Sequence, residues 1–387
     1  MNKIQNHINN FLPDMIAIRH DLHAYPELSN AEYRTSDIVA ELLEKWGYEV
    51  SRGIGKTGVV GTLHIGSGRK SIGLRADMDA LPIYEQTNLA YMSKNAGVMH
   101  ACGHDGHTTI LLTAARYLAE TKKFSGTVHL IFQPAEEGFA GAKAMIDDGL
   151  FERYPCDRVY GLHNWPGRTA GEFYFKVGPM MASVDTVHIS IEGRGGHGAM
   201  PENTIDPIVA GASVVMALQT IISRNIPPVD SALITIGSFQ GGSASNIIPD
   251  LVKLELTIRT FSQKVRVLLK KRVHALVSAQ ATSYGAQAGI LYETGYPPLV
   301  NHADETTYAQ KIAENTFGKD KVVVLSQPVA PSEDFAFMLE KCPGSYFFLG
   351  NGESAELHNP HYVFNDEIIP IGASLWGALV ESYLHKI

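Results

Sequence analysis

The sequence predicts an α/β protein: a mostly parallel sheet with helices on both faces, interrupted by a smaller inserted α+β domain. Near-continuous apolar runs, typical of strands buried on both faces, alternate with helix-spaced segments in residues 1–183. The middle of the chain, 184–294, instead follows a β-α-β-β-α-β order. Alternating helices and strands return in 295–387, so we expect one α/β domain built from both ends of the chain.

The first α/β segment begins with helices and continues with strands. Apolar residues at three- and four-residue spacing predict helices over 14–25 and 31–46. A further helix over 108–121 is apolar on most faces and is therefore expected to be buried. Strands are expected at 59–65, 72–76, 127–132 and 158–162.

The inserted domain has the ferredoxin-like order, with helices expected over 206–223 and 265–283. Its strands are expected at 187–191, 232–239, 251–260 and 289–292. Gly178-Pro179 and Tyr296-Pro297-Pro298 flank it as hinges. The elements expected after it are helices over 304–315, 333–341 and 371–384 and strands over 322–325 and 346–349.

Composition excludes several classes of protein. The 387 residues are 45% hydrophobic and 19% charged, which is typical of a globular chain. The net charge of −8 provides no basic field for nucleic acid. Three cysteines make no disulfide framework, the first twelve residues do not resemble a signal peptide, and no apolar run approaches a membrane span of about 20 residues. We therefore expect a cytoplasmic protein that binds neither nucleic acid nor membrane.

Three predicted strands end in polar residues. Asp77 and Asp79 follow the strand at 72–76, Glu136 and Glu137 follow 127–132, and His163 follows 158–162. Because ligands bind at the carboxyl ends of strands in open α/β sheets, these ends point to one site. Taken singly, the aspartates could be turn residues and the glutamates a solvated loop.

The densest group of possible ligands is HACGHDGH, residues 100–107. Cys102 and His104 have a chelate-like spacing, and transition metals bind thiolate and imidazole readily. Two alternatives to metal binding remain for this segment: a loop with a free thiol, and a Cys-His pair that acts as a thiol nucleophile. Near the C-terminus, His358 and His361 compete as a further candidate ligand.

Candidate substrate contacts lie in the inserted domain. His197 is bracketed by glycines after a strand, which suits contact with a ligand, although an incidental histidine in a glycine turn is the alternative. Asn246 and Arg259 are weaker candidates, since a turn residue and a strand charge explain them equally well.

Six motifs in order give a resemblance that covers essentially the whole chain. HACGHDGH, QPAEEG, GLHNWP, GRGGHGAMP, PSEDF and LHNPHYVFNDE resemble the amidohydrolase branch of the aminoacylase/carboxypeptidase family of dinuclear metallopeptidases. Hippurate hydrolases, N-acyl-amino-acid hydrolases and indole-acetyl-amino-acid hydrolases belong to that branch.

The resemblance implies two divalent ions per chain: Zn, Mn, Co or Ni. It assigns the general base to Glu136, support of the metal site to Asp79, and substrate contacts to His197 and Asn246. The inserted domain would act as a lid and as the interface of a homodimer or homotetramer. The metal ligands that the resemblance implies are Cys102, His104, Glu137, His163 and His358.

This sequence departs from the wider family, whose His-x-Asp motif is here Asp77-Met78-Asp79. The resemblance implies that His104 replaces the missing histidine and Cys102 the bridging aspartate. Two cations sharing a hydroxide would polarise the amide carbonyl of an N-acyl amino acid, and Glu136 would move the proton. We expect Glu137 to point away from Glu136, because adjacent residues of an extended loop face opposite ways.

Other readings of the same residues remain open. A dipeptidase or carboxypeptidase could use the same dinuclear site, and a catalytically dead scaffold could retain the ligands alone. The retained Glu136 argues against the scaffold. For an N-acyl amino acid, we expect donors such as Asn246 and Arg259 to hold the α-carboxylate, while His197 stabilises the oxyanion.

Overall fold

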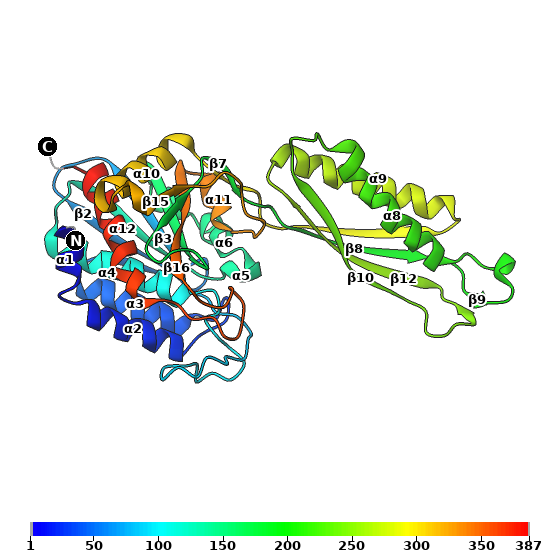
Figure 1. Ribbon diagram of the computed structural model, residues 1–387, viewed down its shortest axis with the longest axis horizontal. Helices are drawn as coiled ribbons and strands as arrows, with labels where there is room; N and C mark the ends of the chain where they lie inside the picture. The colour runs from blue at the N-terminus through cyan, green and yellow to red at the C-terminus, as the bar shows by residue number, and fades with distance from the viewer. Residues whose placement is uncertain (1–2, 386–387) are drawn as a thin grey trace. The chain divides into compact units, whose positions relative to one another are not determined.

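The computed structural model describes residues 3–385, and the chain divides into two compact units (Figure 1). The α/β unit comprises Met1–Gly178, Asn301–Gln327 and Asp334–Ile387, and the inserted unit comprises Pro179–Val300 and Pro328–Glu333. The outer ends of the two predicted α/β segments, residues 1–2 and 386–387, lie outside the described part. The inserted unit extends beyond the predicted 184–294, and the short strands β7 (Gly178–Met181) and β14 (Leu299–Asn301) pair with each other at its boundaries.

An eight-stranded sheet forms the centre of the α/β unit, in the order β1-β2-β4-β3-β5-β16-β6-β15. Strand β3 runs parallel to both β4 and β5, and β5 runs parallel to β16. The predicted fold class is confirmed. The strands are β1 (Glu49–Ile54), β2 (Gly58–Ile65), β3 (Ser71–Asp77), β4 (Gly126–Gln133), β5 (Arg158–Pro166), β6 (Phe173–Phe175), β15 (Val322–Val324) and β16 (Gly344–Gly352).

Helices cover both faces of this sheet, as two glycines of β2 show. Gly58 and Gly61 are three residues apart and so face opposite ways; a Cβ at Gly61 would meet Leu43 of α3, and one at Gly58 would meet Met145 of α6. The helices are α1 (Lys3–Ile8), α2 (Leu12–Ala24), α3 (Tyr33–Lys45), α4 (His104–Thr121), α5 (Glu136–Phe139), α6 (Gly141–Asp147), α7 (Leu150–Arg153), α10 (Ala303–Phe317), α11 (Phe335–Leu339) and α12 (Ile369–Tyr383), with 3-10 turns at Lys319–Lys321 and Asp366–Ile368.

The sequence pattern missed α1 and β1. Strand β1 carries polar and exposed residues over most of its length and pairs only with β2 at the sheet edge, so it lacks the apolar run that marks the inner strands. Helix α1 has six residues, too few to show a helical period.

The inserted unit is a four-stranded antiparallel sheet in the order β10-β12-β8-β13, with α8 and α9 on one face (Figure 1). Burial alternates strictly along β8, as expected for a sheet covered on one side. Asp206 and Ser262 cap the two helices with their side chains. The elements are β8 (Asp185–Glu192), β9 (Gly196–His197), α8 (Pro207–Asn225), β10 (Ala232–Gly241), β11 (Ile247–Ile248), β12 (Leu251–Thr260), α9 (Gln263–Ser283) and β13 (Gln287–Thr294), with a 3-10 turn at Pro201–Asn203.

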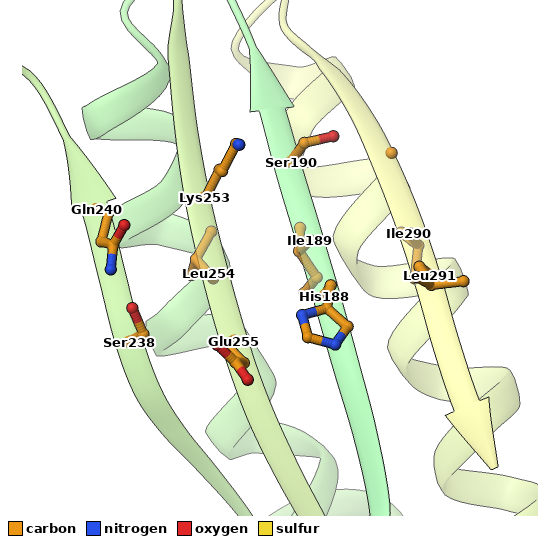
Figure 2. Close-up of a pocket in the computed structure, with 11 residues that line it drawn as sticks. His188, Ile189, Ser190, Ser238, Gln240, Lys253, Leu254, Glu255, Ile290 and Leu291 are labelled. Carbon is orange, nitrogen blue, oxygen red and sulfur yellow. The ribbon is translucent and has the colours of Figure 1, made fainter.

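The uncovered face of this sheet is polar and slightly hollowed. Figure 2 shows His188 and Ser190 of β8 beside Lys253 and Glu255 of β12 on that face. They line an open depression of about 570 Å³, to which Gly289 contributes by lacking a side chain opposite Ser190. Acidic, basic and hydroxyl side chains lie together here, so we regard this face of the sheet as solvated.

Helix α8 is long enough and apolar enough, by length and composition alone, to cross a membrane. Among the described residues it is the one helix that meets this criterion. Its Val214, Leu218 and Ile221 are buried in the core of the inserted unit, where they pack with apolar residues of the sheet. Buried core helices of globular domains have the same composition.

The buried ion pair between Asp185 and Arg266 provides a test of this unit. The guanidinium lies 2.5 Å from Asp185 Oδ1, and Tyr292 donates to the same carboxylate at 2.8 Å. Arg266→Met should lower the free energy of unfolding by about 3–5 kcal/mol, because it leaves a buried charge unpaired. Denaturant unfolding measures this loss. Arg272→Met, which removes only an exposed bond to Asn225, is the control; equal losses would contradict the prediction.

Candidate metal centre

The carboxyl ends of β3, β4 and β5 lie side by side, because β3 is between the other two and parallel to both. Helix α4 begins at the same edge. Gly103, with φ +84°, precedes it, and a side chain there would collide with Asn164 and Tyr362. The tight turn places Cys102 just before the helix and His104 in its first turn.

Cys102, His104 and His163 form the centre of the cluster. One ligand atom from each lies within 4.8 Å of the other two, and all three residues are buried. The Cys102 Sγ is 3.3 Å from His163 Nε2. The Nδ1 of His163 donates to the carbonyl of Asn164 at 2.6 Å, which turns its Nε2 toward the thiol. Sequence reasoning had chosen all three residues.

Glu137 and His358 join the same cluster through Cys102. The His358 backbone donates to the carbonyl of Ala101 at 2.8 Å, which holds this late segment beside Cys102. His358 adopts φ +64°, a left-handed conformation that is uncommon for residues with a side chain. The competing candidate, His361, instead bonds the carbonyl of Gln86 at 2.8 Å through its Nδ1. It therefore supports the loop that carries His358.

Glu136 and Glu137 do not point apart, which corrects the expectation of an extended loop. Ala135, at φ +54°, turns the chain into the short helix α5. Carboxylate oxygens of Glu136 and Glu137 both lie within 4.8 Å of a His104 nitrogen. The turn, rather than strand-like alternation, decides the direction of the two side chains.

Asp79 fixes this turn. Its carboxylate accepts from the backbone N–H groups of Glu136 and Glu137 at 3.1 and 3.0 Å. Burial opposes its charge, but the bonds from His104, Ser29 and the backbone lower the pKa of Asp79 below its ordinary value. Asp79 is thus an ionised carboxylate that orients other groups.

Sequence reasoning named Asp77 at this sheet edge and included His107 in the 100–107 group, but it assigned neither residue a specific role; the structure places both in the cluster. His107 Nδ1 lies 2.6 Å from Asp77 Oδ1, and its Nε2 accepts from the Asn164 backbone at 2.9 Å. His104 and His107 are one turn apart on α4, so they share a helix face. That three-residue spacing was the signal available in the sequence.

The charges around the cluster favour a cation. Burial disfavours the imidazolium of His104, yet Asp77, Asp79 and Glu137 outweigh it and raise the pKa of His104 to about 10. Its Nε2 is buried without a hydrogen-bond partner among the described residues, 3.8 Å from an Asp77 oxygen and 3.9 Å from a Glu137 oxygen. Once His104 gives up its extra proton, a nitrogen lone pair faces these carboxylates; together with the nearby thiol, this is a donor set that fits divalent metal ions.

The same electrostatics argue against a thiol nucleophile. Burial and the nearby Glu137 and Glu136 raise the pKa of the Cys102 thiol well above its ordinary value. Burial and the neighbouring His107 lower the pKa of His163. Cys102 and His163 are therefore both neutral without a cation, whereas a thiol nucleophile needs a thiolate.

The candidate substrate contacts of the inserted unit lie at two places in it. His197 is exposed in β9 and pairs with Ile247, so Asn246 lies in the same two-stranded ribbon. Arg259 is near the far end of β12, half-buried, and donates to the carbonyl of Ala330 at 3.1 Å. Eight residues separate it from the start of β12 at Leu251, which is roughly 26 Å of strand. The structure does not bring Arg259 together with the other two.

Comparison with known proteins decides the family. The model of peptidase family M20/M25/M40 matches residues 73–382. The chain belongs to this family. The resemblance inferred from its motifs is confirmed.

Relatives of this M20 member agree on the type of chemistry. The hippurate hydrolase of Campylobacter jejuni is 46% identical to this chain, and the match covers 95% of this chain and 96% of the hydrolase. The N-acetyl-L-cysteine deacetylase of Bacillus subtilis is 42% identical, and the match covers 92% of this chain and 84% of the deacetylase. A solved Bacillus subtilis structure, a dinuclear metal binding peptidase of the M20 family, matches with a TM-score of 0.85 at 33% identity, covering 98% of this chain and 100% of that one. The chain is a metal-dependent amidohydrolase.

Behind the candidate ligands of this M20 member lies a buried network that sequence reasoning did not anticipate. Asp105, directly after His104, accepts from Arg19 at 3.1 Å and from His23 at 2.8 Å. The other nitrogen of His23 is 3.2 Å from Glu85. Arg19 and His23 are four residues apart on α2 and so share its buried face. The network fixes the first turn of α4, where His104 lies.

This network predicts how stability depends on pH. Burial and Arg19 disfavour protonated His23, but Asp105 and Glu85 outweigh them and raise its pKa to about 9, above an ordinary value of 6.5. A raised pKa in the folded state stabilises the fold fully below pH 6.5, and this contribution is lost as pH rises through 9. The loss is on the order of 3 kcal/mol, from about 1.4 kcal/mol per pKa unit.

Urea unfolding at pH 6, 7.5 and 9 would measure the effect. His23→Gln should lower stability at pH 6 and flatten the decline toward pH 9. His100, which faces His23, has its pKa lowered to about 4 by burial and stays neutral across this range. The exposed His64→Gln is the control and should keep the wild-type slope. An unchanged slope in His23→Gln would refute the prediction.

Proposed function

We propose that the protein hydrolyses the amide bond of N-acyl amino acids and releases a carboxylic acid and a free amino acid. The observation that carries the proposal is the cluster of five possible ligands, three of them buried, with Glu136 beside it. The names of the relatives, a hippurate hydrolase and an N-acetylcysteine deacetylase, support this substrate class.

We assign two divalent ions, Zn, Mn, Co or Ni, to this cluster. Bound there, they would polarise the amide carbonyl and lower the pKa of water. Thiolate, imidazole and carboxylate together suit several of these metals. The proposed ligands are Cys102, His104, Glu137, His163 and His358.

Glu136 is the proposed general base. Its carboxylate accepts the proton of the attacking water and then delivers it to the leaving amide nitrogen. The residue is 7% exposed, which shields its carboxylate from bulk water without isolating it. Asp79 holds its backbone N–H and so positions it. Because this hydrogen bond involves the main chain, the Glu136 carboxylate can accept and release a proton while the backbone of Glu136 stays bound to Asp79.

His197 is proposed to donate a hydrogen bond to the oxyanion that forms at the carbonyl carbon. It is exposed, and one of its ring nitrogens, Nδ1, accepts from the backbone of Ala199 at 3.1 Å, which leaves Nε2–H as a donor. Asn246 is proposed to contact the substrate from the same ribbon, and Arg259 to bind its α-carboxylate. No carboxylate of the described residues forms an ion pair with Arg259.

The distance between these residues supports a homodimer. One small substrate cannot reach both the His197 ribbon and Arg259 of the same inserted unit, which lie more than roughly 26 Å of strand apart. A second subunit can supply one of them. Strand β10 is an unpaired edge, and Val209 and Met216 of α8 are 50% and 72% exposed, which suits an interface between copies. A homotetramer would need a further interface.

A dipeptidase or carboxypeptidase is the second candidate, supported by the peptidase description of the family. It would use the same cluster, since peptides are themselves N-acyl amino acids. We also propose a cytoplasmic location, for which the three free thiols Cys102, Cys156 and Cys342 are the support.

The first test concerns the base. Glu136→Gln should retain the fold and the metals but lose about 10²–10⁴-fold in kcat, because the amide cannot accept a proton. Steady-state kinetics with an N-acyl amino acid measure this loss, and circular dichroism checks the fold. A variant with near-normal kcat would remove Glu136 from the role.

The second test concerns the ligands. Purified protein should contain two divalent ions per chain by plasma mass spectrometry, and a chelator should abolish activity reversibly. Cys102→Ser should reduce metal content, since a hydroxyl replaces a soft thiolate. Cys156→Ser, at a thiol outside the cluster, should not. Full activity of the metal-free protein would contradict the assignment.

The third test concerns the α-carboxylate. A benzoyl amino acid should be hydrolysed about 10–100-fold faster, in kcat/KM, than its C-terminal amide, because a charged hydrogen bond contributes about 1.5–3 kcal/mol. Arg259→Gln should reduce this preference. If the amide is hydrolysed as fast by the wild type, the carboxylate is not recognised and a general amidase is the better description.

A further inference from the structure

The PSEDF motif, residues 331–335, supplies none of the candidate ligands or substrate contacts, yet its aspartate is fully buried. This residue, Asp334, begins the last segment of the α/β unit. Its carboxylate accepts from Arg75 Nη2 at 3.1 Å and from the side-chain amide of Gln133 at 2.8 and 2.9 Å. The backbone N–H of Ala142 donates to it at 2.8 Å. A buried carboxylate whose donors come from β3, β4 and α6 is a fixed point of the structure.

Asp334 holds both ends of the segment that carries Glu136. Gln133 is the last residue of β4, and Ala142 is in the first turn of α6. Because one carboxylate accepts from both, the chain between them is closed into a loop at its base. Asp79 holds the middle of this loop through the backbone N–H of Glu136, and an oxygen of Asp334 lies within 4.8 Å of an oxygen of Glu136. The position of Glu136 therefore depends on Asp334 as well as on Asp79.

Arg75 joins this loop to the candidate metal centre. The guanidinium is buried, and besides Asp334 it donates to Gln133 Oε1 at 2.7 Å and to Asp77 Oδ2 at 2.6 Å. Asp77 lies in turn 2.6 Å from His107 Nδ1, inside the cluster. A guanidinium is planar and rigid, so its bonds fix the acceptors relative to one another. One rigid group thus ties the loop of the proposed base to the cluster of candidate ligands.

We propose that Asp334 is a positioning residue of the reaction: by holding both ends of the loop, it keeps the Glu136 carboxylate where it meets the attacking water. The inference rests on the proposed function and adds to it a residue through which the base acts. A carboxylate that only stabilised the fold would change the free energy of unfolding and leave the folded enzyme's rate unchanged. A positioning carboxylate lowers kcat with little change in KM, because substrate still binds while the base is displaced.

Steady-state kinetics of Asp334→Asn with an N-acyl amino acid test the proposal. The amide keeps one acceptor oxygen and turns an NH₂ group toward a donor, so kcat should fall about 10–100-fold while KM changes less than about twofold. Gln133→Met, which leaves the pair of Asp334 and Arg75 intact, should lower kcat by a smaller factor, and it decides the test if Asp334→Asn does not fold. Asp157→Asn, which removes a carboxylate that accepts from the Ser71 backbone at the other end of β3, is the control. Folded variants with wild-type kcat would overturn the proposal.

A double variant shows whether Asp334 acts through the base. In a Glu136→Gln background, Asp334→Asn should lower the residual kcat by less than about twofold, because the group that it positions is already gone. An equal loss in both backgrounds would mean that Asp334 acts independently of Glu136, and the proposal would fail.

Hydrogen exchange without substrate separates this inference from the proposed function. In the metal-loaded protein, amides of residues 134–142 should exchange about tenfold faster in Asp334→Asn than in the wild type, since the loop loses its hold at both ends. Asp157→Asn should leave their exchange unchanged. If the wild type hydrolyses no N-acyl amino acid yet exchange follows this pattern, the hydrolase proposal fails and the hold of Asp334 on the loop stands. If the wild type is active and Asp334→Asn changes neither exchange nor kcat, the positioning role fails alone.

Discussion

The Asp79 carboxylate is the constraint on which the candidate metal centre depends. It accepts from Ser29 Oγ and from the backbone of Glu136 and Glu137, and it lies 3.2 Å from His104 Nδ1. A buried carboxylate is stable only when its lone pairs are satisfied, and here the donors come from separate parts of the chain. One charge thereby sets the position of Glu136, the proposed base, and the direction of the His104 imidazole.

A second layer of charge surrounds this arrangement. Asp77 is paired with Arg75 and His107, and Asp105 with Arg19 and His23, all of them buried. Asp77 and Asp105 thus each have their own positively charged or hydrogen-bonding partners. Such networks orient the groups that carry ligands, and a half-satisfied network would be costly. They explain why so many polar residues are tolerated inside an otherwise apolar core.

The sequence was sufficient to predict the layered fold, because apolar residues follow different patterns in the two units. They run almost continuously along the buried parallel strands, and they alternate with polar residues along the strands of the inserted sheet, which is covered on one face only. It was also sufficient to choose the residues that meet at the ends of β3, β4 and β5, because parallel neighbours share an edge. It was not sufficient for the turn at Ala135, whose left-handed conformation has no signature in an alanine.

The position of the insertion has a consequence for how the protein is made. Strand β5 (Arg158–Pro166) pairs with β16 (Gly344–Gly352), and the inserted unit is encoded between them. At a ribosomal rate of about 5–20 residues per second, β5 waits roughly ten to forty seconds for its neighbour. The inserted unit is synthesised entirely within that interval and can fold first. The nascent α/β unit, meanwhile, exposes a buried strand edge, so the cell must protect this chain from aggregation longest at the strand that carries His163.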